Sequence, residues 1–411
     1  MDLIAESVNN VDAVRTLADA IGLQDYNPWG PDVGQYLDRV ESQLGRLNNK
    51  ATGLATAADL GIPRHLSFSA PAVIRPQVPL HLTGRPDYFP EYPNYISPQE
   101  LSFVSLPDGY FCDFSSGPLT ITPDGKTVLR DYSSHHSQLV YYYEVSVGRL
   151  LAQARYVDGT VMPIADDARP TNYCHWMLDW LPRLAALGDT VRRADFFVAV
   201  CSLNAPYQRE SLRMCGIDPN RIIELGPFET IRAKRLVVPD DFDTWKTHPA
   251  HKAAPWTIDY LHSKLGMSAL LDGRAGARRP EKIYISRRDA SWRRVLNDDE
   301  LIKHLEGKGY TVITPGELPL AEQIASFARA KRIISLHGAG LANVAFCSPD
   351  CSLIEIFPRN RGTPAFCVLA AAVGCSYLTY VSDDVVAGGR ADVDDIMLDV
   401  DDFMDRCGPY L

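Results

Sequence analysis

The second half of the chain alternates short apolar runs with stretches in which apolar residues recur every three or four positions. The apolar runs predict β-strands, and the helical spacing predicts helices between them. From residue 172 onward, the predicted strands are 194–200, 222–225, 235–239, 282–286, 310–313, 332–336, 353–357 and 376–381. The predicted helices are 207–215, 298–308, 320–330, 340–346 and 366–373. This alternation is typical of right-handed crossovers and a parallel sheet, so we predict an α/β fold.

Breaks in this pattern divide the chain into five segments. We predict a helical appendage over 1–60, an N-terminal α/β domain with a strand-rich first part over 61–245, and a linker over 246–280. A second α/β domain follows over 281–385, and 386–411 is an acidic tail or short helix. The helices of the appendage pack either on the body of the protein or on another subunit. A homo-oligomer formed through them therefore stays one of two options.

One segment of mixed character opens this second half. In 172–184, Asn172, His175 and Asp179 stand at i, i+3 and i+7, so a helix places them on one face. The rest of the segment is so apolar that the helix should be mostly buried. Unpaired buried polar groups cost about 1–3 kcal/mol each, so the three polar residues need a reason. Either a hydrogen-bond network in the core or an active-site cleft provides one.

The composition sets the broad class of protein. A chain of 411 residues, 46% hydrophobic and 22% charged, is typical of a soluble protein with two domains. The formal net charge of −10 argues against a general nucleic-acid surface or an anionic membrane surface. The apolar runs fall short of the roughly 20 residues that span a bilayer, and the acidic start does not resemble a signal peptide. Nine scattered cysteines without a Cys-x-x-Cys pair indicate reduced thiols, so we expect a cytoplasmic protein without a zinc site.

Three predicted strands of the second domain end in residues with distinctive chemistry. Ligands bind beyond the carboxyl ends of the strands in an open parallel sheet, so these ends are the candidate site. The residues are Ser286-Arg287-Arg288 with Arg293 and Arg294, the stretch His337-Gly338-Ala339-Gly340-Leu341-Ala342-Asn343, and Glu355. Arginine forks match phosphate oxygens, and glycines before a helix N-terminus allow an anion to approach the backbone closely. Together these residues favour a nucleotide-linked ligand, with Glu355 as a partner for ribose hydroxyls.

Each of these residues also has a structural explanation. The arginines can be surface salt-bridge partners, His337 a core histidine bonded to a carbonyl, and Glu355 the partner of an arginine. The glycine loop is Gly-x-Gly-x-x-Asn, which is an incomplete dinucleotide fingerprint, so we do not predict NAD. Asp-x-Asp pairs at 241–243, 392–394 and 399–401 are interpreted as a turn and a solvated tail, and we predict no metal ligands.

Four blocks of the chain, taken together, resemble those of the family 61 glycosyltransferases, which are also described as capsular polysaccharide biosynthesis proteins. The blocks are Asn172-Tyr173-Cys174-His175-Trp176-Met177-Leu178-Asp179, Tyr284-Ile285-Ser286-Arg287-Arg288 with Arg294 and Asn297, Ser335 to Asn343, and Ile354-Glu355-Ile356-Phe357-Pro358. They occur in the order and spacing of the family, and the resemblance covers roughly residues 100–385. Cys174 departs from the family, in which a second aromatic residue is frequent at this position.

The resemblance implies a GT-B-like architecture, in which two Rossmann-like domains face each other across a cleft. It implies inversion at the anomeric carbon, no metal, and no cofactor other than a nucleotide-sugar co-substrate, with UDP as the expected nucleotide. The donor would be held mainly by the C-terminal domain, and the N-terminal domain would take a glycan or glycoconjugate acceptor for surface polysaccharide or glycoconjugate biosynthesis.

An inverting transfer needs a base for the acceptor hydroxyl and positive charge or hydrogen-bond donors for the departing diphosphate. We assign the base to His175 or Asp179, which stay open as alternatives. The expected substrate-binding residues are Asn172, Arg287, Arg288, Arg294, His337, Gly338, Ala339, Gly340, Asn343 and Glu355. The alternative function is a non-catalytic nucleotide- or glycan-binding partner in a polysaccharide assembly complex. A weaker option is an enzyme that acts on another phosphorylated ligand.

Overall fold

A computed structural model gives the fold. It describes residues 54–68, 72–74, 80–87, 95–97, 101–114, 117–133, 151–164, 172–201, 203–226, 229–239, 254–266, 280–386 and 394–411. Most of the predicted helical appendage, the acidic pair at 241–243 and the basic part of the linker at 273–279 lie outside the described residues, as does the proposed oligomer contact.

The N-terminal half is built on a ten-stranded mixed sheet in which the strand order is β1-β9-β8-β7-β13-β10-β11-β12, with β6 beside β13 and β2 beside β6. Its strands are β1 Leu54–Ala55, β2 Arg64–Phe68, β6 Leu101–Pro107, β7 Tyr110–Phe114, β8 Gly117–Ile121, β9 Val128–Leu129, β10 Arg155–Ile164, β11 Phe196–Val200, β12 Ile222–Glu224 and β13 Thr230–Pro239. The strands β13, β10, β11 and β12 run parallel, whereas β6 and β7 pair with β13 in antiparallel fashion. The parallel part is therefore the α/β portion of this half.

The C-terminal half is built on a six-stranded parallel sheet with the order β15-β14-β16-β17-β18-β4. The strands are β4 Leu80–His81, β14 Lys282–Ile285, β15 Thr311–Ile313, β16 Arg332–Leu336, β17 Ser352–Pro358 and β18 Ser376–Ser382. Two small antiparallel pairs accompany the sheets, β3 Ala72–Ile74 with β5 Tyr95–Ser97 and β19 Val385–Val386 with β20 Asp395–Ile396. Numbered within the domain, the central order is 2-1-3-4-5, a doubly wound order whose direction reverses between β14 and β16.

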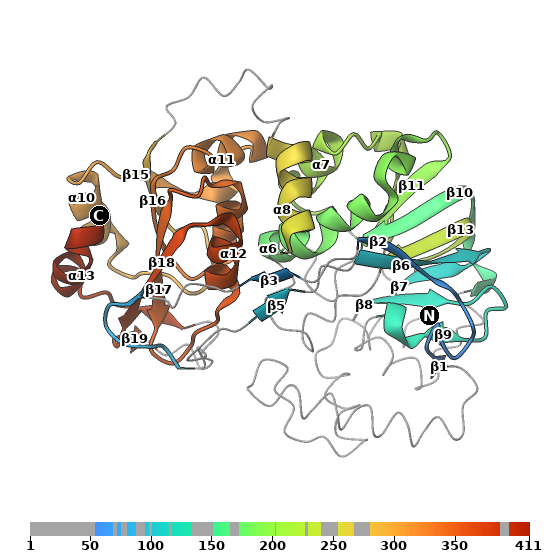
Figure 1. The fold of residues 1–411 in the computed structure, drawn as a ribbon, viewed down its shortest axis with the longest axis horizontal. Coiled ribbons are helices and arrows are strands. Elements are labelled where there is room, and N and C mark those ends of the chain that lie inside the picture. Colours follow the sequence, from blue (N-terminus) through green and yellow to red (C-terminus); the bar gives the residue numbers. More distant parts are fainter. Residues whose placement is uncertain are drawn as a thin grey trace, which may run out of the picture.

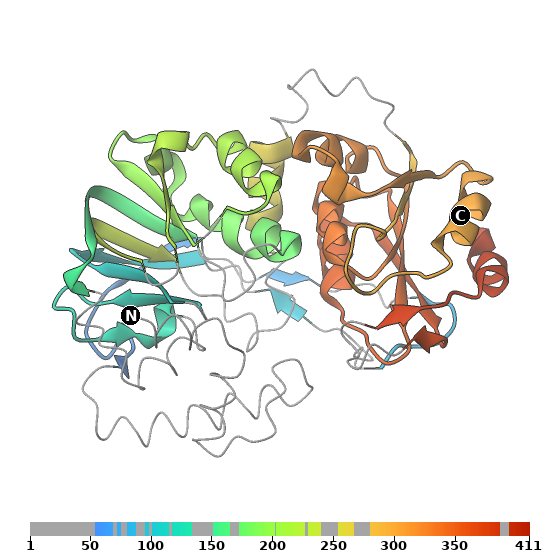
Figure 2. The ribbon, with the colours of Figure 1, turned by 180° about the vertical axis from the view of Figure 1, so that it is seen from behind.

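Helices pack between the two sheets and on the outer face of the second one (Figures 1 and 2). The inner helices are α6 Tyr173–His175, η2 Trp176–Trp180, η3 Leu181–Arg192, α7 Pro206–Met214, α8 Pro255–Leu261, η6 His262–Gly266, α11 Leu320–Phe327, η8 Ala339–Phe346 and α12 Ala365–Val373. The outer helices are α10 Asp298–Glu306 and α13 Val400–Cys407. Short 3-10 turns are η1 Arg130–Tyr132, η4 Pro219–Arg221, η7 Pro315–Glu317 and η9 Gly408–Tyr410.

One apolar core joins the two halves. It extends from Met162 and Val198 of the first sheet, through the inner helices, to Ile283 and Ile285 of the second sheet. Tyr284, between these two isoleucines, belongs instead to the core under α10 and α13, as the alternation of side chains along a strand requires. The two halves are thus packed against each other over a shared core, which fixes the position of one set of strand ends relative to the other half.

Most of the predicted strands and helices from residue 194 onward are confirmed, with ends that shift by a few residues. The ten-residue strand β10 at the centre of the first sheet was not predicted, because Asp158, Gly159 and Pro163 interrupt its apolar pattern. The acidic C-terminal residues are not simply solvated: β20 and α13 pack on the second half, and Phe403 is fully buried. The strand β4, from the segment assigned to the first domain, lies at the edge of the second sheet.

Within the described residues, every helix lacks the combination of length and apolar character that crossing a membrane requires.

Candidate functional site

The polar helix segment starts with a capped turn. Asn172 is the N-cap of α6, and its Oδ1 accepts hydrogen bonds from the backbone N–H groups of Cys174 (3.0 Å) and His175 (3.3 Å). The next five residues form a single π-helical turn, η2, closed by a bond from Leu181 N–H to the carbonyl of Trp176. Pro182 then has no N–H to continue the α-helical pattern, and a 3-10 segment follows. Asn172 is therefore committed to shaping the backbone, and π-turns of this kind are frequent at functional sites.

This turn brings His175 and Asp179 into direct contact. His175 Nδ1 lies 2.7 Å from Asp179 Oδ2. The His175 side chain is 23% exposed, whereas that of Asp179 is 1% exposed. The backbone carbonyl of Asp179 accepts a 2.9 Å hydrogen bond from Arg183 Nε, and the Arg183 guanidinium stacks 3.9 Å above the Trp180 ring. A buried carboxylate thus orients an imidazole that reaches the surface.

Arg287 and Gly338 meet at the reversal point of the second sheet. The Arg287 guanidinium donates to the backbone carbonyls of Arg293 (2.8 Å, from Nε) and Trp292 (3.2 Å, from Nη2). A Cβ added at Gly338 would collide with Arg287 Nη1, so only glycine leaves room for this side chain. Burial lowers the pKa of Arg287 from its ordinary value, although the group remains charged at neutral pH. Arg293, which closes this loop, has a φ of 53°, a rare conformation for a residue with a side chain.

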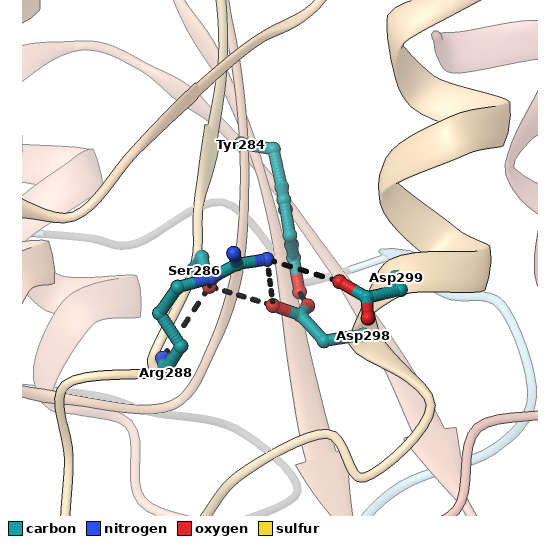
Figure 3. Close-up of polar contacts among 5 residues, drawn as sticks. All are labelled: Tyr284, Ser286, Arg288, Asp298 and Asp299. Atoms are coloured by element: carbon teal, nitrogen blue, oxygen red, sulfur yellow. Dashed lines mark hydrogen bonds and ion pairs between the residues drawn. The ribbon is translucent and has the colours of Figure 1, made fainter.

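The other two predicted arginines are paired with carboxylates. Figure 3 shows Arg288 between Asp298 (3.5 Å) and Asp299 (3.4 Å), with Tyr284 and Ser286 also bonded to Asp298. Arg294 donates to Asp395 Oδ2 from Nη2 at 2.8 Å, and this pairing raises the pKa of Arg294.

Neither Arg288 nor Arg294 lines the cavity described below. Their structural explanation, salt bridges at the surface, accounts for the geometry. The sequence placed them in one cluster with Arg287 because they lie close together along the chain, but the loop turns their guanidinium groups toward acidic partners.

Glu355 is held inside the second half. It lies on β17, it is fully buried, and its Oε1 lies 2.5 Å from His337 Nδ1. Its Oε2 accepts a 2.6 Å hydrogen bond from the hydroxyl of Tyr377. Burial raises the pKa of Glu355 to about 8, against the smaller lowering effects of the Tyr377 hydrogen bond and the Arg293 charge. The expectation that Glu355 holds a ribose therefore needs correction, because both carboxyl oxygens are engaged away from solvent.

The side chain of Asn343 is also hydrogen-bonded to other protein groups. Its Nδ2 donates to Gln323 Oε1 and to the carbonyl of Gly340, both at 3.2 Å, and its Oδ1 accepts a 2.6 Å hydrogen bond from Tyr173 OH. Tyr173 belongs to α6 in the first half, so this buried bond joins the two halves of the molecule. Burial raises the pKa of Tyr173, which keeps the hydroxyl protonated as a donor.

A cavity of about 220 Å³ lies where these elements meet. It is bounded by the carboxyl end of β14 and the loops that follow β15 and β16, and by α6 and the start of α7 from the other half. Its lining residues are Tyr173, Pro206, Tyr207, Glu210, Ile285, Ser286, Arg287, Asp289, Ala290, Pro315, Gly316, Leu318, Leu320, Gln323, Ala339 and Gly340. The cavity therefore lies at the reversal point of a doubly wound sheet, where ligands of such sheets bind.

Several of these residues were not predicted from the sequence. Tyr173 and Tyr207 form an edge-to-face pair (4.9 Å between centroids, 88°) on the first-half wall. Glu210 Oε2 accepts a 2.7 Å bond from the N–H of Leu320 at the start of α11. Tyr173 lies inside the Asn172–Asp179 block, so the sequence could have indicated it as a site residue. Tyr207 and Glu210 lie on an ordinary amphipathic helix, whose pattern does not distinguish them from other surface residues.

Among the described residues, no cluster of three or more His, Cys, Asp and Glu side chains is arranged to hold a metal ion.

Comparison with known proteins assigns this region to a family. The family model described as Glycosyltransferase 61 matches residues 173–354, which include the His175–Asp179 pair, Arg287 and the glycine loop. This segment belongs to the glycosyltransferase 61 family. It contains the cavity and the wall residues from both halves.

Two individual proteins are similar to parts of the chain. The EGF domain-specific O-linked N-acetylglucosamine transferase of Drosophila melanogaster is 34% identical over 107 residues, which cover 25% of this chain and 20% of that protein. The chain thus matches about a fifth of the length of this relative. The crystal structure of the bacterial iron-containing dodecameric glycosyltransferase TibC, from enterotoxigenic E. coli, aligns with 12% identity and a TM-score of 0.23 over 67% of this chain and 84% of TibC.

Proposed function

We propose that this protein is an inverting, metal-independent glycosyltransferase of the GT-B type that moves a sugar from a nucleotide-sugar donor to a hydroxyl group of a glycan or glycoconjugate. UDP is the proposed nucleotide of the donor. The family of residues 173–354 supports the reaction class. The resemblance of the four sequence blocks motivates the proposal of inversion without a metal.

The shared cavity, which Arg287 lines, is the observation that carries the proposal; His175 and Gly338 are not among its lining residues and are assigned from their own contacts. An active site for group transfer must bring donor and acceptor together, and both halves of the molecule contribute walls to one cavity. Its volume of about 220 Å³ is below the roughly 300–1,000 Å³ of typical ligand pockets, so a nucleotide would extend out of it along the strand ends. Aromatic side chains line one wall and Arg287 the other, which suits a ligand with an apolar part and an anionic part.

The anionic part would lie at Arg287 and the loop that begins at Gly338. The guanidinium is positioned by two backbone carbonyls, so it would meet a diphosphate without losing side-chain entropy on binding. Gly338 is the N-cap of η8, and Ala339 and Gly340 are its first two residues, so their backbone N–H groups can face phosphate oxygens. Arg288 and Arg294 do not enter this proposal, because acidic side chains already hold them.

The base would be the His175–Asp179 pair, with His175 in contact with the acceptor. The carboxylate is buried and bonded to Nδ1, so we assign the proton transfer to Nε2. In the transfer, the acceptor oxygen bonds to the anomeric carbon while the bond from that carbon to the diphosphate oxygen breaks. The acceptor proton passes to His175, Asp179 stabilises the imidazolium, and Arg287 stabilises the charge of the departing diphosphate.

The test is a mass-spectrometric screen of transfer and donor hydrolysis with UDP-, GDP- and CMP-linked sugars, using glycans and a folded EGF domain as acceptors. His175→Ala should lower turnover at least about 100-fold, the usual range for a lost general base, while UDP binding stays near the wild-type value. The exposed His304→Ala on α10 is the matched control. Nucleotide binding without turnover for any donor would favour a non-catalytic binding partner. Unchanged turnover in His175→Ala would remove the pair from the mechanism.

A further inference from the structure

Glu355 is a buried acid that the proposed transfer reaction does not use directly. One carboxyl oxygen contacts His337 Nδ1 and the other accepts from Tyr377, so the group is saturated by protein partners. It is fully buried on the central strand β17. A buried carboxyl group costs stability unless hydrogen bonds replace its lost hydration, and here His337 and Tyr377 provide them.

The His337 ring is fixed in place. Phe357 lies nearly parallel to it (5.3 Å between centroids, 19°), and Phe366 of α12 packs on it at a tilt (5.4 Å, 48°). With the ring held by two aromatic faces and Nδ1 held by Glu355, the ring cannot exchange its two nitrogens without breaking these contacts. Nε2 is the nitrogen on the side away from Glu355. His337 immediately precedes Gly338, where an added Cβ would collide with Arg287 Nη1, so His337 adjoins the loop that we propose binds the diphosphate.

The number of protons on this pair decides what Nε2 can do. With one proton, shared between Glu355 and Nδ1, the pair carries a net negative charge and Nε2 has a lone pair. With a second proton the pair is neutral overall, and Nε2 carries a hydrogen. A net charge in a fully buried site is unfavourable, so burial favours the second proton. The pKa of Glu355, raised to about 8, agrees with this state at neutral pH.

We propose that Glu355 and Tyr377 are positioning residues that hold the His337 ring and keep a proton on its Nε2, so that this nitrogen donates a hydrogen bond to the diphosphate of the donor. This inference rests on the proposed function for the identity of the anion. The groups that face Glu355 are His337 from the loop after β16, Tyr377 from β18, Cys367 from α12 and the charge of Arg293. Glu355 therefore acts through His337 and does not touch the ligand.

The direct test is ¹⁵N NMR of the histidine rings in the ligand-free full chain between pH 6 and 9. We expect His337 Nε2 to be protonated at pH 7 and to lose its hydrogen near pH 8. In Glu355→Gln the titrating carboxyl group is replaced by an amide, so the loss of a proton near pH 8 should be absent. The exposed Glu306→Gln is the matched control, and His304 is the internal reference. An Nε2 without a hydrogen in the wild-type protein at pH 7 would overturn the proposal.

Tyr377→Phe gives a second, independent readout. It removes the hydrogen bond that lowers the pKa of Glu355, so the pH at which Nε2 loses its hydrogen should move upward. If Tyr377 had a purely structural role, the pH at which Nε2 loses its hydrogen would not change in this variant. That result would contradict the proposal. This variant keeps the ring and its packing, so it remains informative if Glu355→Gln does not fold.

UDP binding links the proton to function. If only the protonated pair binds UDP well, titration near pH 8 makes binding about fourfold weaker at pH 8.5 than at pH 7. Glu355→Gln should bind UDP equally at both values, and an equal pH dependence in both proteins would count against the proposal. Absence of binding for every nucleotide would refute the proposed function, whereas the NMR measurement would still decide the protonation of His337.

Discussion

Replacing Gly338 by alanine tests the contact that organises the anion-binding end of the site. Its φ of 179° is open to any residue, so the backbone does not resist the change. The resistance comes from Arg287, whose Nη1 occupies the space that a Cβ would need. To make room, Arg287 must give up its hydrogen bonds to the carbonyls of Arg293, Trp292, or both. A hydrogen bond to a charged group contributes about 1.5–3 kcal/mol, so the expected loss of stability is about 1.5–6 kcal/mol.

Gly340→Ala is the matched control two residues away. A Cβ there would lie 3.4 Å from Pro315 Cγ and 3.5 Å from Ile285 Cγ2, which is ordinary contact. We therefore expect a small change in the free energy of unfolding, measured by urea denaturation at pH 7. UDP affinity should fall in Gly338→Ala because the guanidinium has moved.

A double-mutant cycle isolates the cause. In an Arg287→Ala background the collision is absent, so Gly338→Ala should cost almost nothing further. If Gly338→Ala destabilises both backgrounds equally, or if Gly340→Ala costs as much as Gly338→Ala, the reasoning from the Arg287 contact is wrong.

The remaining predictions concern the contact between the halves, the buried acid and an arginine outside the cavity. Tyr173→Phe leaves Asn343 Oδ1 without its buried donor and should lower the free energy of unfolding by about 1–3 kcal/mol, whereas Tyr156→Phe, at an exposed tyrosine, should not. Wild-type stability should fall by about 1.3 kcal/mol between pH 6.5 and 8, and by about 2 kcal/mol over the whole titration, because an unfolded histidine releases its proton near 6.5 while the folded His337–Glu355 pair retains one until about 8. The sign follows from a raised folded pKa, since the stability is present at low pH and lost as pH rises; denaturation curves of Glu355→Gln that show the same slope would contradict this assignment. Arg294→Gln should leave UDP affinity unchanged in a titration, because its partner is Asp395, and a loss comparable to that of Arg287→Gln would return Arg294 to the site.

Local pattern sufficed for the second sheet and for the strand ends that line the cavity. Uninterrupted apolar strands such as β16 and β17, separated by helices that bury one face, leave few alternatives to a parallel sheet. The strand ends that carry Arg287 and the glycine loop then converge by topology alone. The strand β10 was not predicted because its glycine and proline interrupt the apolar pattern. Its place in the sheet depends on pairing with β11 and β13, which are distant in the sequence.

The roles of individual side chains depended on contacts between distant parts of the chain. Arg294 meets Asp395 across 101 residues, and Tyr173 meets Asn343 across 170 residues. Glu355 and Tyr377 come together only because β17 and β18 are neighbours. The guanidinium, amide and carboxyl groups of these residues could equally bind a ligand. Residue type and spacing therefore did not distinguish a ligand contact from a structural one. In contrast, His175 and Asp179 are one turn apart, and their contact was foreseeable.

The position of a bound nucleoside diphosphate tests the central claim most directly. A crystal structure of the full chain with UDP should place the diphosphate at the carboxyl ends of β14 and β16, within hydrogen-bond distance of Arg287 and the Gly338–Gly340 backbone. The imidazole of His175 should face the same space from the other half. A diphosphate bound at another face of the molecule, or at this loop with His175 turned away from it, would contradict a transfer site shared by the two halves.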